Sequence, residues 1–123
     1  MKEGWFEETY WVAYDETESK SMTSGYGISR LLPGHTVVAL VGWDDFIVRD
    51  EVGRLFRVPT VPLSAKYVEP FRPLPDLDEL TSDERYAGKI KWYVQSIAFG
   101  GSPNAEENMT WVDVTNHQEL VWW

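Results

Sequence analysis

The chain has 123 residues, of which 43% are hydrophobic and 15% aromatic, and its formal net charge is −9. This length fits one folded domain over residues 1–123, and the hydrophobic content is that of a globular protein. The absence of cysteine excludes disulfides, thiol catalysis and cysteine-ligated zinc, and the acidic balance opposes binding to nucleic acid or to anionic membranes.

The start of the chain carries no recognisable secretory signal, because residues 1–11 contain three glutamates and no long apolar run. The longest apolar run, residues 36–43, is too short to cross a membrane. Together with the absence of cysteine, these features lead us to expect a cytoplasmic protein that does not bind membranes.

The first predicted strand spans residues 5–14, where aromatic and β-branched residues of both parities indicate burial on both faces. Residues 15–27 contain Ser, Thr and Gly without an apolar period, which predicts a mobile loop. Residues 28–32 then fit one helical turn, or an apolar loop, ahead of the Pro-Gly turn at residues 33–34.

Three short strands joined by two tight turns form the predicted centre of the fold. The strands are residues 35–43, 45–50 and 54–62, and the turns lie at residues 42–44 and 50–53. The third strand contains a proline, which lacks an N–H, so this strand should end there or lie at an edge. Tight turns between neighbouring strands predict an antiparallel meander.

Beyond the meander, the sequence indicates short elements. Residues 63–71 fit a helical turn, and the proline-rich residues 70–80 fit a connection. The spacing of Thr81 and Glu84 matches a capping box and predicts a short helix that ends at Gly88.

The clearest strand is residues 89–99, where apolar and polar positions alternate until a change of parity at residues 95–96 indicates a bulge. A loop with one helical turn follows, then a strand over residues 109–114 and a C-terminal helix over residues 116–123 with Thr115 as its N-cap. The whole pattern predicts an α+β domain: a mostly antiparallel sheet of about five to six strands, with short helices and the C-terminal helix packed on it.

Few residues fit a catalytic or metal site. Asp113 and His117 would share a helix face only if the last helix began early, and a zinc site needs three or four ligands. We therefore interpret His117 as a solvated residue and predict no metal. The sequence also lacks a G-x-S-x-G motif and a phosphate-binding G-K-[ST] motif, so we expect neither enzymatic activity nor a cofactor.

Paired carboxylates occur at residues 44–45 and 50–51. Neighbours along a strand point to opposite faces, so neither pair forms a two-carboxylate acid/base site by itself. We interpret Asp44 as a turn residue that hydrogen-bonds to nearby backbone. Trp43, beside it, is either a buried cover over the end of the sheet or an exposed contact residue, and burial is the favoured interpretation.

One part of the chain resembles a known family. Residues 26–71 contain Leu-Pro-Gly at positions 32–34, an apolar strand, and a Gly/Asp turn at residues 42–45. Asp50 and a Val-Pro pair at residues 58–59 follow in the same order. This block resembles the central part of the SUKH superfamily. It differs in having Trp and Asp where that turn is usually glycine-rich, and the family's N-terminal helices have no counterpart here.

The resemblance implies a non-enzymatic module, namely an immunity protein that binds and neutralises a cognate bacterial toxin such as a nuclease. A basic partner would suit the acidic chain. The residues that we expect to contact this partner are a tryptophan and acids at one end of the sheet and on a later loop: Trp43, Asp44, Asp45, Asp50, Glu51, Asp76, Asp78 and Glu79.

The alternative is a small regulatory or structural domain that acts through self-association, as a homodimer, or within a larger assembly. The aromatic pair Trp122-Trp123 at the end of the chain suggests it, because large aromatic residues at a terminus are usually buried against something.

Overall fold

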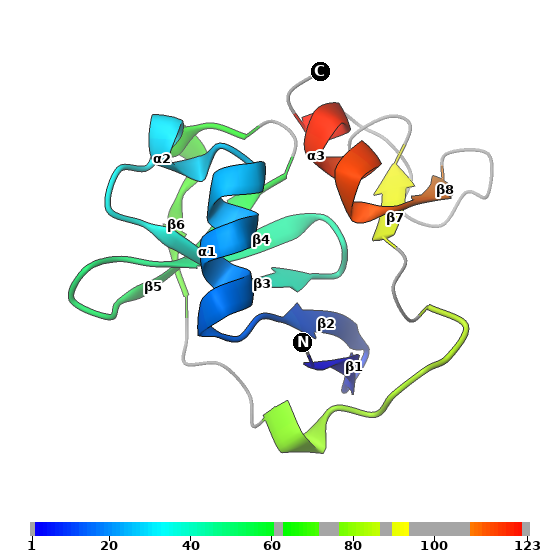
Figure 1. Cartoon of the computed structure of the whole chain (residues 1–123). Coiled ribbons are helices and arrows are strands. Elements are labelled where there is room, and N and C mark those ends of the chain that lie inside the picture. The colour runs from blue at the N-terminus through cyan, green and yellow to red at the C-terminus, as the bar shows by residue number, and fades with distance from the viewer. Residues whose placement is uncertain (1, 61–62, 72–76, 87–89, 94–108, 122–123) are drawn as a thin grey trace.

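A computed structural model describes residues 2–60, 63–71, 77–86, 90–93 and 109–121 (Figure 1). Its centre is a six-stranded sheet in which the strands follow one another in chain order, each antiparallel to the next. The strands are β1 (Lys2–Phe6), β2 (Thr9–Ala13), β3 (Thr36–Val41), β4 (Asp45–Arg49), β5 (Leu55–Pro59) and β6 (Glu69–Pro70). This arrangement confirms the predicted α+β fold and its antiparallel meander.

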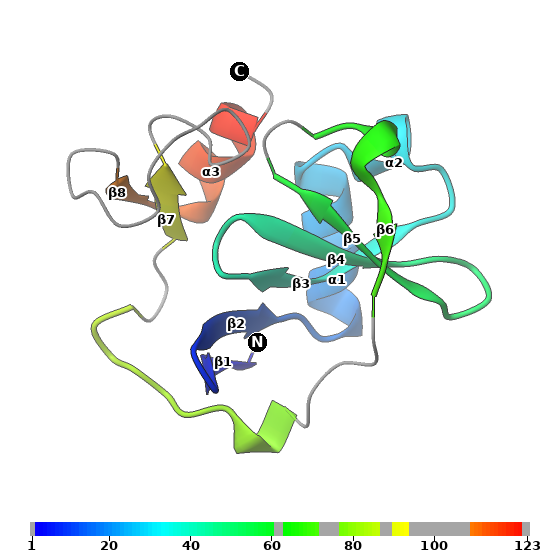
Figure 2. The ribbon, with the colours of Figure 1, turned by 180° about the vertical axis from the view of Figure 1, so that it is seen from behind.

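The remaining elements lie around this sheet. They are the helices α1 (Glu16–Gly25), α2 (Ile28–Leu31) and α3 (Val114–Val121), the 3-10 turns η1 (Ala65–Tyr67) and η2 (Leu77–Glu79), and the paired strands β7 (Ile90–Tyr93) and β8 (Met109–Val112). The two opposite views in Figures 1 and 2 show α1 lying across one face of the large sheet. Within the described residues, no helix is long and apolar enough to cross a membrane.

The single strand predicted over residues 5–14 is wrong, because this segment folds back on itself. A turn at Glu7 and Glu8 separates β1 from β2, and Glu7 adopts a φ of 57°. The turn places Trp5 directly opposite Tyr10, and their rings meet edge to face with centroids 5.3 Å apart. Cross-strand aromatic pairs of this kind stabilise a hairpin. The expected burial on both faces does hold for β2.

Residues 15–27 were predicted as a mobile loop and instead contain α1. Asp15 and Glu18 form a reciprocal capping box, in which each carboxylate accepts a hydrogen bond from the other residue's backbone N–H, at 2.8 and 2.9 Å. The hydroxyl of Thr23 accepts a hydrogen bond from the N–H of Val37 in β3, at 2.9 Å. The helix lacks an apolar period because small polar side chains make much of its contact with the sheet.

The turns of the meander are confirmed. Gly42 in the β3–β4 turn and Gly53 in the β4–β5 turn adopt positive φ values of 58° and 90°, which glycine tolerates without steric cost. The third strand of the meander, β5, ends at Pro59, as predicted. Trp43 also has a positive φ, of 59°, and is only 5% exposed, so it is a buried residue at the end of the sheet.

The C-terminal helix begins earlier than predicted. The N-cap is Asp113 rather than Thr115, since the Asp113 carboxylate accepts a hydrogen bond from the N–H of Asn116 at 2.8 Å. The strand before it is confirmed as β8. The predicted bulge at residues 95–96 and the loop with a helical turn lie outside the described residues.

The short helix predicted after Thr81 is not present in the described part of that segment. Residues 84–86 form a turn, and Asp83 accepts a hydrogen bond from the N–H of Arg85 at 3.1 Å. Gly88, the predicted end of this helix, lies outside the described residues. Earlier in the chain, the helical turn predicted within residues 63–71 is confirmed as η1, and the short strand β6 follows it in the same segment.

The large sheet is buried on both faces at β4. Phe46 and Val48 belong to one apolar cluster, whereas Ile47 belongs to a second cluster on the other face. Ile90 from β7 and Val121 from α3 join the first cluster. The C-terminal helix therefore packs against the α1 side of the sheet, which confirms the predicted packing.

His117 is fully buried, so its interpretation as a solvated residue is wrong. Its Nδ1 lies 2.7 Å from the hydroxyl of Tyr26, and its ring meets Trp92 edge to face with centroids 5.6 Å apart. The early start of α3 puts His117 on the inner face of the helix. Burial lowers the pKa of His117 to about 4.

Because His117 is buried in its neutral form, the folded protein loses stability as the pH falls. Between about pH 6.5 and about pH 4, unfolded chains bind a proton at His117 that folded chains do not. The contribution of His117 to stability is therefore fully present above pH 6.5 and is lost as pH falls toward 4. We expect the imidazole NMR resonances of His117 to stay those of the neutral ring down to about pH 4. Titration of His117 near pH 6.5 in the folded protein would contradict this.

Candidate functional site

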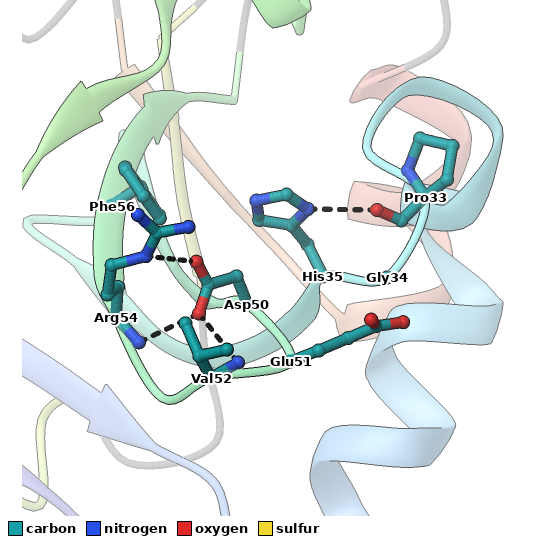
Figure 3. Close-up of a pocket in the computed structure, with 8 residues that line it drawn as sticks. All are labelled: Pro33, Gly34, His35, Asp50, Glu51, Val52, Arg54 and Phe56. Atoms are coloured by element: carbon teal, nitrogen blue, oxygen red, sulfur yellow. Dashed lines mark hydrogen bonds and ion pairs between the residues drawn. The ribbon is translucent and has the colours of Figure 1, made fainter.

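Two turns enclose an open cavity of about 400 Å³ at one end of β4 and β5 (Figure 3). One wall is the turn between α2 and β3, and the other is the turn between β4 and β5. The residues that line the cavity are Pro33, Gly34, His35, Asp50, Glu51, Val52, Arg54 and Phe56. Two of the acids predicted to contact a partner, Asp50 and Glu51, are among them.

Asp50 fixes the shape of the second turn. One of its carboxylate oxygens accepts hydrogen bonds from the N–H groups of Val52 and Arg54, at 3.1 and 2.8 Å, and the other accepts from Nε of Arg54 at 2.7 Å. Partial burial by itself would raise the pKa of Asp50, but these hydrogen bonds and the Arg54 charge outweigh it and hold the pKa below its usual value. The turn is therefore rigid, and the Asp50 and Arg54 charges are already paired.

Glu51 and Val52 project from this rigid turn. Figure 3 shows the Glu51 side chain extending past Gly34, and a Cβ added to Gly34 would lie 3.0 Å from a Glu51 carboxylate oxygen. Val52 is 75% exposed, which is unusual for a β-branched apolar residue at the tip of a turn. The Glu51 carboxylate, which has no ion-pair partner among the described residues, thus stands next to the exposed apolar side chain of Val52 at the rim.

His35 lies across the cavity from this pair. Its Nδ1 is 3.1 Å from the carbonyl oxygen of Pro33, and its ring meets Phe56 edge to face with centroids 5.7 Å apart. Donation from Nδ1–H to that carbonyl leaves Nε2 as an acceptor on the cavity side. Among the lining residues there is no hydroxyl or thiol that His35 could activate, so the site can recognise a ligand but offers no nucleophile.

The other predicted contact residues lie elsewhere. Asp44 and Asp45 stand at the opposite end of β4 from Asp50, and the five-residue strand between the two groups spans roughly 17 Å. The expected acidic surface at one end of the sheet is therefore wrong. Trp43 is only 5% exposed, so it offers little surface to a protein partner.

Asp44 and Asp45 are themselves half-buried. Burial, with the neighbouring Asp45 charge, raises the pKa of Asp44 to about 7. Burial also raises the pKa of Asp45, although Arg57 opposes the shift. A second cavity, of about 270 Å³, opens beside them and is lined by Asp45, Arg57, Pro59, Tyr67 and Glu69.

The last group of predicted acids is on η2, where Asp78 forms an ion pair with Lys2 of β1. Glu79 is exposed beside it, and Asp76 lies outside the described residues. Ion pairs on an exposed surface stabilise little. This group belongs to the β1 side of the molecule, so the predicted contact residues do not form one surface.

No metal site is found among the described residues. Asp113 and His117 do fall on adjacent turns of one helix, but His117 contacts Tyr26 in the core and Asp113 caps α3. In the contacts that the structure describes, Asp113 and His117 therefore stabilise α3 and its packing.

The sequence interpretation missed three residues that line the first cavity: His35, Val52 and Arg54. A usable signal existed, because Val52 is the one apolar residue in the Asp-Glu-Val-Gly turn, where polar residues are the rule. His35 carried no such signal. Its place beside Phe56 depends on how β3 and β5 are each aligned with β4, which lies between them.

Comparisons of the chain with protein-family models, with curated proteins and with solved structures found no match.

The buried Asp44 gives a second pH dependence, opposite in sign to that of His117. Its pKa is raised in the folded protein, so between about pH 4 and pH 7 folded chains hold a proton that unfolded chains have lost. Its contribution to stability is therefore highest below pH 4 and falls as pH rises toward 7. We expect Asp44→Asn to remove this decline in urea unfolding curves measured across that range.

Asp50→Asn is the matched control, because the pKa of Asp50 is lowered rather than raised. Its contribution is present above the pKa of the unfolded chain and is lost as pH falls. Asp50→Asn should therefore lower stability at neutral pH, where Asp44→Asn raises it. Equal pH profiles for Asp44→Asn and the unmodified protein would show that Asp44 titrates normally.

Proposed function

We propose that this protein is a non-enzymatic binding module that neutralises a basic protein partner, and that it does so through the rim of the cavity between the α2–β3 and β4–β5 turns. The observation that carries this proposal is that the exposed Val52 adjoins Glu51, a carboxylate with no ion-pair partner in the described part of the chain, on a turn that Asp50 holds rigid. An apolar contact beside a charge is the usual chemistry of a protein interface.

Rigidity supports the choice of this turn over the other acidic groups. Binding costs less when the contacting side chains are already ordered, and three hydrogen bonds to Asp50 fix the backbone under Glu51. Asp44 and Asp45, by contrast, are half-buried, and burial raises the pKa of both carboxyls, that of Asp44 to about 7. Their charge is less available to an approaching partner.

Charge supports a basic partner. The chain has 20 acidic and 11 basic residues, and such an excess accelerates encounter with a positively charged protein. Of the charged residues at the rim, Arg54 is already paired with Asp50, which leaves Glu51 to act on a partner.

The identity of the partner class comes from the resemblance of residues 26–71 to the SUKH superfamily. On that ground we propose a cognate bacterial toxin, such as a nuclease, and a cytoplasmic immunity protein that blocks it. A nuclease binds a polyanion and is itself commonly basic. Its charge would therefore complement the acidic excess of this chain.

The first experiment is a pull-down from the source lysate at low and high salt, with bound proteins identified by mass. A basic protein that salt releases, and whose toxicity on expression is removed by co-expression of this chain, supports the proposal. Capture of no basic protein at any salt concentration contradicts it.

Variants of the rim then test the site. We expect Glu51→Lys to slow association with the captured partner about tenfold at low salt and to weaken its salt dependence, because a steering charge is reversed. Val52→Asp should instead speed dissociation. Glu79→Lys makes the same change of net charge on η2 and should alter neither rate strongly. If Glu79→Lys slows association as much as Glu51→Lys, then overall charge rather than this rim governs binding.

Self-association is the second candidate, and one residue favours it. Trp111 on β8 is 40% exposed, which is high for a tryptophan, and aromatic residues are enriched at interfaces between protein chains. Sedimentation at several concentrations tests this directly. Concentration-dependent dimerisation that Trp111→Ala abolishes would support it, and a monomer at all concentrations would exclude it.

A further inference from the structure

Lys91 lies in a corner made by two tryptophan side chains. Its Nζ is 4.7 Å from the ring centroid of Trp43 and 5.6 Å from that of Trp111. The two indoles are 5.5 Å apart and almost perpendicular, at 89°. We call Trp43 and Trp111 the aromatic corner. Tyr86 supports its outer wall by stacking on Trp111 at 5.1 Å, with an angle of 24° between the rings.

The inner wall of the corner is held in place at a cost. Trp43 adopts the left-handed backbone conformation, with a φ of 59°, which is unfavourable for a bulky residue. Its indole N–H is buried and has no hydrogen-bond partner among the described residues. Tyr10 stacks on its ring at 4.6 Å and fixes its orientation. Costly features of this kind concentrate at sites that bind ligands.

The outer wall gives access from solvent. Trp111 is 40% exposed, although it contacts Trp43 and Tyr86. A core residue would be covered, whereas Trp111 closes only one side of the corner. The outer wall of the corner therefore borders solvent, and Lys91 itself is only partly buried.

Lys91 is a poor occupant of this space. No carboxylate lies within ion-pair distance of its Nζ among the described residues. Burial lowers the pKa of Lys91, because the ammonium is partly removed from water. A primary ammonium is strongly hydrated and needs hydrogen-bond acceptors, and indole faces provide none.

A different cation suits the corner better. A quaternary ammonium group has no N–H to satisfy and is weakly hydrated, and perpendicular aromatic faces are the arrangement that recognises it. The lysine–aromatic pair of Lys66 and Tyr67, with Nζ 5.1 Å from the ring, shows the contrast, because there one exposed ring contacts the lysine and no second wall is present among the described contacts.

We propose that the aromatic corner is a binding site for a quaternary ammonium group, and that Lys91 is an internal occupant which such a group displaces. The unbranched lysine side chain can swing into solvent, so displacement needs no change in the backbone. The site is separate from the rim of the first cavity and does not depend on the function proposed for that rim.

The test uses the full chain and tetramethylammonium as the probe, followed by the indole N–H resonances of the tryptophans in NMR spectra. We expect Lys91→Ala to bind the probe about tenfold more tightly than the unmodified protein, because the competing ammonium is gone. Lys91→Gln, which keeps part of the side chain, should show the same direction. Trp111→Leu in the Lys91→Ala background should abolish binding.

Two controls make the result specific. Lys66→Ala removes the other lysine–aromatic contact and should leave probe binding unchanged. Neopentyl alcohol has nearly the shape of tetramethylammonium without the charge, and it should not shift the indole resonances. If neither Lys91→Ala nor Lys91→Gln binds the probe more tightly than the unmodified protein, or if the neutral alcohol binds equally well, the proposal is wrong.

The same spectra identify the source of the group. A trimethyl-lysine peptide and phosphocholine carry the same ammonium, and both should compete with tetramethylammonium. Tighter binding of the peptide assigns the site to a methylated protein, whereas tighter binding of phosphocholine assigns it to a choline headgroup. Binding of tetramethylammonium with no competition by either compound would contradict a biological role for the corner.

Discussion

The side chain of Tyr26 leaves the end of α1 and is enclosed between β4 and α3. Its ring lies against Phe46, with centroids 4.8 Å apart, and its hydroxyl is 2.7 Å from Nδ1 of His117. A helix of eight residues has little stability alone, so α3 depends on such tertiary contacts. The position of α3 fixes β8, which directly precedes it, and β8 carries the exposed wall of the aromatic corner. This buried polar contact, together with the packing of Val121, therefore holds α3 and the adjoining β8 against the sheet.

Much of the fold was predictable because local signals and tertiary structure agree in the meander. Gly34 and Gly53 mark turns that need positive φ, and the apolar run of β3 is buried on both faces. The same reasoning failed at α1, where Ser and Thr contact the sheet in place of an apolar stripe. The Asp15–Glu18 capping box was the available signal, but a cap is informative only when a helix is already suspected.

The candidate site was predictable in part, and the reason is geometric. Asp50 and Glu51 could be named from the turn that contains them, since turns are read from local sequence. Grouping them with Asp44 and Asp45 was inconsistent with the strand already predicted over residues 45–50, because that strand sends the two turns to opposite ends. Lys91 could not be placed beside Trp43 from the sequence, because the contact joins the small sheet to the large one. The start of α3 was likewise misplaced by two residues, and the interpretation of His117 as solvated went with it.

The backbone of β1 has a consequence for how other proteins can approach. The N–H of Trp5 donates to the carbonyl of Thr81 at 2.8 Å, and the N–H of Thr81 donates to the carbonyl of Trp5 at 2.9 Å. A Cβ on Gly4 would lie 2.5 Å from the Thr81 carbonyl oxygen, so the two segments touch. At the other edge, β6 is two residues long and ends in Pro70. Among the described residues, neither edge of the large sheet offers a long run of unpaired amides, which protects it from edge-to-edge aggregation and from strand addition. A partner of this sheet must therefore be recognised through side chains and not by an added strand.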